Sequence, residues 1–273
     1  MFTTVDTLGA ELPYYGIMIA LGILACFLLI LFTRHKRENI DGVEYVLIGL
    51  VSAISAFIMA HIVYGIAHLN KIIFVVTHTD RFFESIDSFI FYFSDIFGGM
   101  VFYGGLIGAC IGAYIYMRKA KLNTNEYSDT LAPCIPLFHA FGRVGCFLVG
   151  CCYGIKSDIG FTYHYAIVEA ANGVCRFPVQ LLEATENIFI CILLTVMLCK
   201  CKKMQHGMLI WVYGLIYPVI RFINEFLRGD TVERGFFGIF STSQWISIFI
   251  FALSLTVISV KTIKKRKVLN NKI

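Results

Sequence analysis

The 273-residue sequence has little charge and lacks several common catalytic motifs. Only 15% of its residues are charged and 58% are hydrophobic, whereas about 25% charged residues are usual in a soluble domain. The H-E-x-x-H, G-x-S-x-G, Walker and dinucleotide-binding motifs are missing, which leaves a zinc peptidase, a serine hydrolase and a nucleotide-driven pump without support. No basic residue precedes the first apolar run and no A-x-A site follows it, so we expect no cleavable signal peptide. The composition therefore indicates an integral membrane protein.

Apolar segments of the length that crosses a bilayer, roughly 17–25 residues, recur along the chain. The fourth of them is the least regular, because Pro133, Pro136 and several glycines weaken it as a helix. We predict an all-α membrane protein with seven transmembrane helices in a single integral membrane domain, 1–273. The expected spans cover about 14–32, 43–67, 97–117, 131–149, 179–199, 208–227 and 240–260.

Basic residues mark one side of these spans. The net charge of +5 does not indicate nucleic-acid binding, because 15 of the 23 Lys and Arg residues cluster after the first, third, fifth and seventh spans. By the positive-inside rule, the N-terminus lies outside and the C-terminus in the cytoplasm. The clustered residues are Arg34, Lys36 and Arg37; Arg118, Lys119 and Lys121; Lys200, Lys202 and Lys203; and Lys261, Lys264, Lys265, Arg266, Lys267 and Lys272.

Two segments on the predicted outer face are longer than simple connectors. The segment 70–96 mixes acidic and aromatic residues, which suits a helix lying in the membrane interface. The segment 151–178 is rich in turn residues and ends at Arg176-Phe177-Pro178. These elaborated outer segments favour a protein that works at the outer leaflet.

Arg143 is an unexpected charge within the apolar stretch 136–154, between Gly142 and Gly145. A charge at membrane depth costs several kcal/mol, so it should face the protein interior and have a partner. The glycines would let another backbone or a ligand approach closely. The partner of a buried guanidinium is either a phosphate of a ligand or a carboxylate in an internal Arg–Glu clamp.

Arg221 and Glu225 are two further charges in an expected span, and their spacing of four places them on one helix face. They form either a structural ion pair or part of an anion site. In the second interpretation Arg143 and Arg221 converge from two helices on one phosphate, while Glu225 orients one of them. Arg228 adds a third cation about one turn further toward the outer interface.

Glycine pairs bracket residues 100–103 in the sequence GGMVFYGGLIGA. Paired small residues such as Gly104 and Gly105 allow neighbouring membrane helices to pack closely. They could also open room for a lipid. Tyr103 could place a phenol in such a cavity or serve as an interface anchor.

Cys146, Cys151 and Cys152 are the cysteines most open to a chemical role. Their C-x4-C-C spacing does not match the usual C-x2-C zinc pattern, so we expect no metal and no other cofactor. They fill small core spaces or act as thiols or a disulfide near the outer surface.

Six sequence blocks in this order resemble the bacterial prolipoprotein diacylglyceryl transferase family over nearly the whole chain. The seven expected spans accompany these blocks. The blocks are YYGIM at 14–18, GGMVFYGGLIG at 98–108, GRVGCFLVGCCYG at 142–154, PVQLLE at 178–183, YPVIRFINEFLR at 217–228 and SQ at 243–244.

The resemblance implies a function. Members of this family move the diacylglyceryl group of phosphatidylglycerol onto the lipobox cysteine thiol of a preprolipoprotein, giving a thioether-linked lipid and glycerol phosphate. The implied partners are phosphatidylglycerol, signal peptides with a lipobox cysteine, and membrane lipid, with no nucleic acid. The implied location is the bacterial plasma membrane, and the reacting cysteine belongs to the substrate.

The resemblance also implies roles for individual residues. Arg143 and Arg221 would hold the phosphoglycerol headgroup and stabilise charge on the departing phosphate. Tyr103 would be a third catalytic residue. Tyr15 and Tyr217 would line the site, Gly154 would preserve a loop, and Glu225 would orient the basic cluster. The other implied substrate-site residues are Gly104, Gly105, Cys146 and Arg228.

The chain departs from the family pattern at polar positions. The family reads HGGL where this chain has Tyr103 at the first position, and a tyrosine with a pKa near 10 takes a thiol proton poorly. The family's GRxGNFxNGE carries Cys146, Val149 and Cys151 here instead of two asparagines and a glutamate. His139 could be a substitute base or a core histidine.

These departures leave alternatives open. One is a divergent paralogue with another lipid donor or acceptor. Another is a phospholipid or anion carrier that binds a phosphate between Arg143 and Arg221, although no inverted repeat is evident. A non-catalytic membrane scaffold would leave both arginines unexplained.

Overall fold

The computed structural model describes residues 4–7, 10–34, 42–79, 85–99, 101–201, 204–230 and 235–270, with the backbone alone at 4–7, 10–12, 102–103 and 268–270. The chain divides into two compact units. Unit 1 contains Met1–Glu38 and Asn125–Ile273, and unit 2 contains Asn39–Thr124. The prediction of a single membrane domain stays a prediction.

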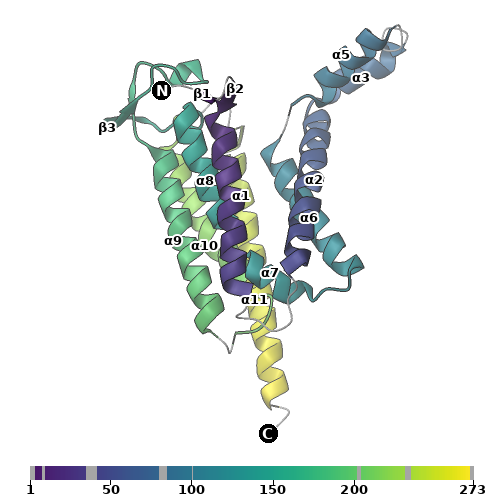
Figure 1. Ribbon diagram of the computed structural model, residues 1–273, viewed down its shortest axis with the longest axis vertical. Coiled ribbons are helices and arrows are strands. Elements are labelled where there is room, and N and C mark those ends of the chain that lie inside the picture. The colour runs from purple at the N-terminus through teal and green to yellow at the C-terminus, as the bar shows by residue number, and fades with distance from the viewer. Residues whose placement is uncertain are drawn as a thin grey trace. The chain divides into compact units, whose positions relative to one another are not determined.

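Unit 1 is a bundle of helices that lie side by side (Figure 1). Helix α8 packs against α1 and α9, and α10 packs against α9 and α11. Buried apolar side chains of α9, with Ala132 and Leu209, form its main core. The helices are α1 (Tyr14–Thr33), α7 (Thr124–Leu131), α8 (Cys134–Val149), α9 (Val179–Lys200), α10 (Leu209–Asn224), the short η3 (Glu225–Leu227) and α11 (Thr242–Asn270).

The two prolines of the fourth expected span do not break α8. Pro133 is the residue before the helix, and Pro136 lies in its first turn. Proline is tolerated there because the first amide groups of a helix have no intrahelical acceptor. The sequence therefore located the proline-rich irregularity correctly, because α8 begins at these prolines.

Three short antiparallel strand pairs lie between the helices of unit 1. Their partners are β1 (Thr4–Thr7) with β2 (Ala10–Pro13), β3 (Lys156–Thr162) with β4 (Cys175–Arg176), and β5 (Phe236–Phe237) with β6 (Phe240–Ser241). The second pair and the short helix η2 (Glu169–Ala171) form the elaborated connection expected at 151–178.

The buried side chain of Arg176 holds this connection together. Its guanidinium donates to the backbone carbonyls of Ala170, Ala171 and Gly154 at 2.6, 3.3 and 3.3 Å, and it lies 4.2 Å from the ring centroid of Tyr153. Arginine suits this position because its planar fork presents five donors at once.

Unit 2 is built on α2 (Gly42–Ala67) and α6 (Phe102–Lys119), joined by α3 (Leu69–Thr77) and α5 (Ile86–Phe97). The glycines of α6 touch α2 directly. A Cβ atom at Gly104 would lie 2.7 Å from Val63 Cβ, and one at Gly108 would lie 2.4 Å from the carbonyl oxygen of Ser55. The glycine pattern therefore serves close helix packing.

Two helices occupy the segment in which we expected an interfacial helix. Lys71 of α3 and Asp95 of α5 form an ion pair of 2.6 Å, and both helices expose large apolar side chains such as Ile73 and Ile90. Residues 80–84 of this segment lie outside the described ones. The described backbone forms one helix before and one helix after them, and the location of this segment in the membrane interface stays a prediction.

Six helical stretches among the described residues are long and apolar enough to cross a membrane. Helix α6 fills the position of the third expected span, but it ends on Arg118 and Lys119 and is not one of the six. The protein is therefore a mostly helical, multi-pass membrane protein. The six stretches are Tyr14–Thr33, Gly42–Ala67, Thr124–Val149, Val179–Lys200, Leu209–Leu227 and Thr242–Lys267.

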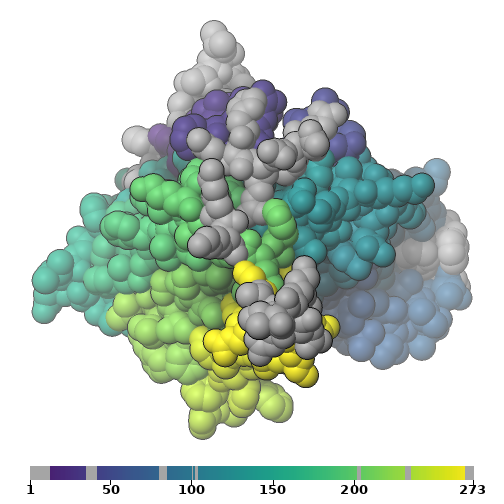
Figure 2. Space-filling model, turned by 90° about the horizontal axis from the view of Figure 1, so that it is seen from below, coloured from purple at the N-terminus to yellow at the C-terminus, as the bar shows by residue number. Residues whose placement is uncertain are grey.

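The basic clusters that follow the apolar portions of α1, α9 and α11 gather at one end of unit 1. Helices α1, α9 and α11 all run toward this end (Figure 1), where Arg34, Lys200 and the basic run of α11 follow their apolar portions. Lys261 of α11 donates to the carbonyl of Gly207, in the α9–α10 connection, at 2.8 Å. Seen from below, the yellow surface of α11 accordingly adjoins green surface (Figure 2).

Candidate functional site

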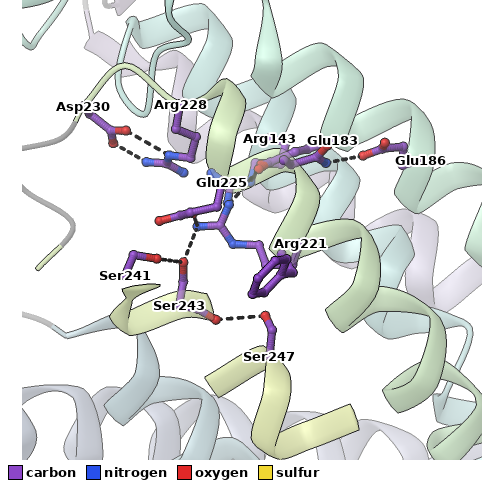
Figure 3. A network of polar contacts seen from close by, with 12 residues as sticks. Arg143, Glu183, Glu186, Arg221, Glu225, Arg228, Asp230, Ser241, Ser243 and Ser247 are labelled. Carbon is purple, nitrogen blue, oxygen red and sulfur yellow. Dashed lines mark hydrogen bonds and ion pairs between the residues drawn. The ribbon is translucent and has the colours of Figure 1, made fainter. Parts of the chain in front are cut away.

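Arg143, Glu183 and Arg221 meet from three neighbouring helices (Figure 3). The helix ends that carry them lie opposite the end of unit 1 that carries the basic clusters of α1, α9 and α11 (Figure 1). Glu183 Oε1 lies 3.0 Å from Arg221 Nη1, and Glu183 Oε2 lies 2.5 Å from Arg143 Nε. The side chain of Glu183 is 4% exposed and those of the arginines 12%. The two arginines thus converge as predicted, with a carboxylate between them.

The Nε–H group of Arg143 points at His139 rather than at Glu183. It donates to His139 Nε2 at 3.2 Å, so its short contact with Glu183 is an electrostatic one. Because both residues lie on α8, four positions apart, the hydrogen bond follows from helix geometry. His139 Nε2 accepts this bond and its lone pair is occupied, which argues against the histidine as a substitute base.

The terminal nitrogens of Arg143 are the donors of the site that remain open to a ligand. Among the residues that the structure describes, neither Nη1 nor Nη2 of Arg143 forms a hydrogen bond, and the hydrogen bond of this guanidinium is the one from Nε. A guanidinium that is nearly buried with its fork open is suited to an anion, since bidentate binding of phosphate or carboxylate uses such paired donors.

Arg221 is held on two further sides. Its Nη2 lies 2.7 Å from Glu225 Oε2, the predicted pair four residues apart on the helix, and donates to Ser243 Oγ at 3.4 Å. Ser243 comes from the start of α11 and is also hydrogen-bonded to Ser241 at 3.0 Å. Glu225 itself is buried, so the Arg221–Glu225 ion pair is shielded from solvent.

Arg228 lies close to the other arginines but has its own carboxylate partner. Its Nε donates to Asp230 Oδ1 at 2.9 Å, and its Nη2 pairs with Asp230 Oδ2. Burial alone would lower the pKa of Arg228, but the Asp230 carboxylate raises it, so the guanidinium stays charged. The Arg228 backbone also forms a β-bridge with Gly154.

Gly154 sits where no side chain fits. A Cβ atom there would lie 2.1 Å from the carbonyl oxygen of Phe177 and 3.2 Å from that of Leu227. Gly154 therefore lets the 151–178 connection cross the end of α10 and η3 in direct backbone contact.

The two tyrosines expected to line the site, Tyr15 and Tyr217, contact different residues of α8. The ring of Tyr15, 42% exposed, packs against Gly145, where a Cβ atom would lie 2.9 Å from Tyr15 Cδ2. Tyr217 is half-buried, and its ring centroid lies 5.3 Å from that of His139. By contrast, no atom of the described residues lies within 4 Å of a Cβ atom built on Gly142, so this face of α8 is open among them.

Cys146 is buried at the end of α8, and Cys151 and Cys152 are half-buried in the residues that follow. Their three sulfur atoms lie within 4.8 Å of one another. The cysteines thus form one cluster, which the spacing along the chain did not predict.

Three residues assigned to the site from sequence belong to unit 2. Gly104 and Gly105 lie on α6 and face α2. The side chain of Tyr103 lies outside the described residues. The catalytic and substrate-binding roles assigned to these three residues stay predictions.

Glu183 is the central residue that our sequence reasoning missed. In the sequence it ends the PVQLLE block and lies inside an expected span. An acidic residue there indicates a buried, partnered charge just as Arg143 does. Glu186, one turn further along α9, accepts a hydrogen bond from Asn224 and was missed for the same reason. Gln180 of this block is almost fully buried and donates to the carbonyl of Cys151 at 2.8 Å.

Comparisons with known proteins agree with one another. Residues 4–260 match the family described as prolipoprotein diacylglyceryl transferase. The chain is 33% identical over 264 residues to phosphatidylglycerol–prolipoprotein diacylglyceryl transferase 2 of Clostridium perfringens, covering 96% of each chain. It is 30% identical to the transferase of Clostridium tetani, with 96% and 98% coverage, and 31% identical to that of Helicobacter pylori strain J99, with 95% and 92% coverage.

Proposed function

Because the chain belongs to the prolipoprotein diacylglyceryl transferase family, we propose that it transfers the diacylglyceryl group of phosphatidylglycerol to the cysteine thiol of a prolipoprotein. It is then a lipoprotein-maturing transferase. The acceptor thiol is the lipobox cysteine in the signal peptide of the incoming protein.

The observation that carries this proposal is the open guanidinium fork of Arg143. Its Nη1 and Nη2 form no hydrogen bond with the described residues, while its Nε donates to His139 and forms an ion pair with Glu183. A phosphodiester that entered here would supply the acceptor that the fork lacks, in the bidentate geometry that a guanidinium offers to phosphate oxygens.

Arg143 and Arg221 have distinct parts in this mechanism. Arg143 binds the phosphate through its open fork. Arg221, fixed by Glu183, Glu225 and Ser243, places a second positive charge beside it. As the bond between the glyceryl carbon and the phosphate oxygen breaks, negative charge grows on the departing glycerol phosphate. Preorganised cations in a site with little water stabilise this charge.

The proposal includes an orientation in the bacterial plasma membrane. With α6 as the third of seven spans, the basic ends of α1, α6, α9 and α11 lie in the cytoplasm and the N-terminus lies outside. The 18 residues of α6 extend about 27 Å, which is close to the hydrocarbon thickness. The Arg143 site then opens toward the outer leaflet.

A transfer assay with purified full-length protein tests the reaction. The substrates are phosphatidylglycerol with radiolabelled acyl chains, in detergent micelles, and a peptide with a lipobox cysteine. We expect label on that cysteine, and a loss of about 100- to 1,000-fold for Arg143→Gln and for Arg221→Gln, the usual cost of removing a charge-stabilising donor.

Arg118→Gln is the matched control, because Arg118 is exposed at the far end of α6 and its loss should leave the rate unchanged. A peptide with serine in place of cysteine should stay unlabelled. A folded preparation that puts no label on the cysteine peptide would show that this chain does not catalyse the reaction.

A further inference from the structure

Three thiols beside the arginines have no part in the proposed phosphate binding. The sulfur atoms of Cys146, Cys151 and Cys152 lie within 4.8 Å of one another. Within the described residues, no histidine or carboxylate belongs to this group. Two of the thiols are half-buried, so the cluster is neither sealed in the core nor fully exposed.

The backbone after α8 is folded so that these thiols converge. The amides of Gly150 and Cys151 both donate to the carbonyl of Cys146, at 3.0 and 3.1 Å, which turns the chain back over the helix end. Cys152 has a left-handed backbone with φ of 53°, a conformation disfavoured for any residue with a Cβ atom. The fold therefore holds Cys152 in a strained conformation, with its thiol near the other two.

We propose that Cys146, Cys151 and Cys152 bind a thiophilic divalent cation, Zn²⁺, whose fourth coordination position takes the acceptor cysteine thiol. The assignment of the acceptor thiol as the fourth ligand rests on the proposed function. Tetrahedral Zn²⁺ with bonds to sulfur of about 2.3 Å requires sulfur atoms about 3.8 Å apart. Small side-chain rotations bring three sulfurs within 4.8 Å to that spacing. Three protein ligands and one open position are typical of a catalytic zinc site.

The surrounding charges suit this site. Three thiolates and one Zn²⁺ ion carry a net charge of −1, which needs positive compensation in a partly buried place. Arg143 and Arg228 both lie near enough to interact electrostatically with Cys152, and Arg143 also interacts with Cys146. The same arginine that has an open fork for a phosphate thus adjoins the cluster.

The metal would supply what His139 does not. His139 Nε2 already accepts a hydrogen bond, whereas a thiol bound to Zn²⁺ is deprotonated outright. The thiol proton goes to solvent, and a sulfur lone pair attacks the glyceryl carbon attached to the phosphate oxygen. A C–S bond forms, the C–O bond breaks, and its electron pair leaves with glycerol phosphate. The neutral thioether is a weak ligand and leaves the metal, and no oxidant or reductant is needed.

Zinc binding is measured first, with the purified full-length protein and Zn²⁺ alone. After dialysis we expect one zinc per chain by elemental analysis, and none in the triple variant Cys146→Ser, Cys151→Ser, Cys152→Ser. Cys175→Ser is the matched control, because Cys175 is half-buried in β4 outside the cluster, and it should retain the metal. If the triple variant does not fold, Cys151→Ser alone should weaken zinc binding by more than about tenfold.

Two results would overturn the metal site. One is zinc content that is the same in the wild type and the triple variant. The other is an intact mass two hydrogens lower, with the oxidised pair mapped to these cysteines, which would make the cluster a disulfide.

The fourth ligand is tested without any transfer reaction. The protein loaded with Co²⁺ in place of Zn²⁺ should show thiolate-to-cobalt charge-transfer absorption, and this band should grow when the lipobox peptide is added. A peptide with serine in place of cysteine should cause no change. An unchanged spectrum with the cysteine peptide contradicts the fourth-ligand assignment even if the enzyme is active. A changed spectrum without transfer contradicts the proposed function alone.

Discussion

At the scale of single residues, charge inside the membrane-spanning helices is balanced by contacts between helices. Glu183 contacts Arg143 of α8 and Arg221 of α10 from its own place on α9. A carboxylate buried between two guanidiniums compensates both, and it also fixes their separation. Glu183 is therefore a positioning residue for the proposed phosphate site.

Replacing Glu183 tests this position. Glu183→Ala leaves two nearly buried cations without their shared partner, so we expect the free energy of unfolding to fall by about 3–5 kcal/mol. Chemical denaturation of the detergent-solubilised protein measures this change. Glu169→Ala removes an exposed carboxylate in η2 and should change it by less than about 0.5 kcal/mol. Equal effects of the two substitutions would rule out a central role for Glu183.

At the scale of secondary-structure elements, small residues set how closely the helices approach. Gly104, Gly108 and Gly112 recur every four residues along α6, and a Cβ atom at any of them would lie within 3 Å of an atom of α2. Helix α2 carries Ser55 and Met59 at the crossing. These glycines, which have no side chain, thus allow the two helices of unit 2 to pack closely.

A pair of glycine-to-alanine substitutions separates packing from helix propensity. At Gly108 the new methyl group would meet Ser55 O at 2.4 Å, so we expect Gly108→Ala to destabilise the protein by about 1–3 kcal/mol. Gly49 lies in α2, where a Cβ atom would meet no atom of the described residues within 4 Å, and Gly49→Ala should be neutral or stabilise by up to about 1 kcal/mol. Thermal unfolding of both variants checks the sign, and stabilisation by Gly108→Ala would refute close packing at this point.

At the scale of the whole molecule, unit 1 separates two chemically different ends. Arg34, Lys200 and Lys261 mark one end, and the Arg143 site with the 151–178 connection marks the other. This polarity is consistent with the proposed orientation, in which the positive-inside rule places the basic end in the cytoplasm. The exposed apolar side chains along α1 and α11 suit contact with lipid between the two ends.

Cysteine labelling in right-side-out membrane vesicles tests the orientation. Ile159 of β3 is 81% exposed, so Ile159→Cys should react at position 159 with a membrane-impermeant maleimide. The native Cys201, exposed just after α9, should react only after the vesicles are permeabilised. Peptide mass spectrometry assigns the label to each position. Labelling of Cys201 in sealed vesicles, with position 159 protected, would reverse the proposed topology.

The sequence by itself determined the class of protein, the helices of unit 1 and the Arg221–Glu225 pair. The length of an apolar run and the position of a basic cluster can be read directly along the chain. Residues four apart on a helix share a face whatever lies around them. The six ordered blocks were also sufficient to identify the family.

Only the tertiary structure decided which charges meet across helices. Arg221 lies 38 residues from Glu183 along the chain, Arg143 is similarly distant on the other side, and their contact depends on how α8, α9 and α10 are packed and rotated. The same holds for the cysteines, whose sulfurs meet because the backbone after α8 turns through two left-handed residues, Gly150 and Cys152. Helix periodicity repeats within one element, whereas contacts between elements follow from side-chain packing that no local spacing specifies.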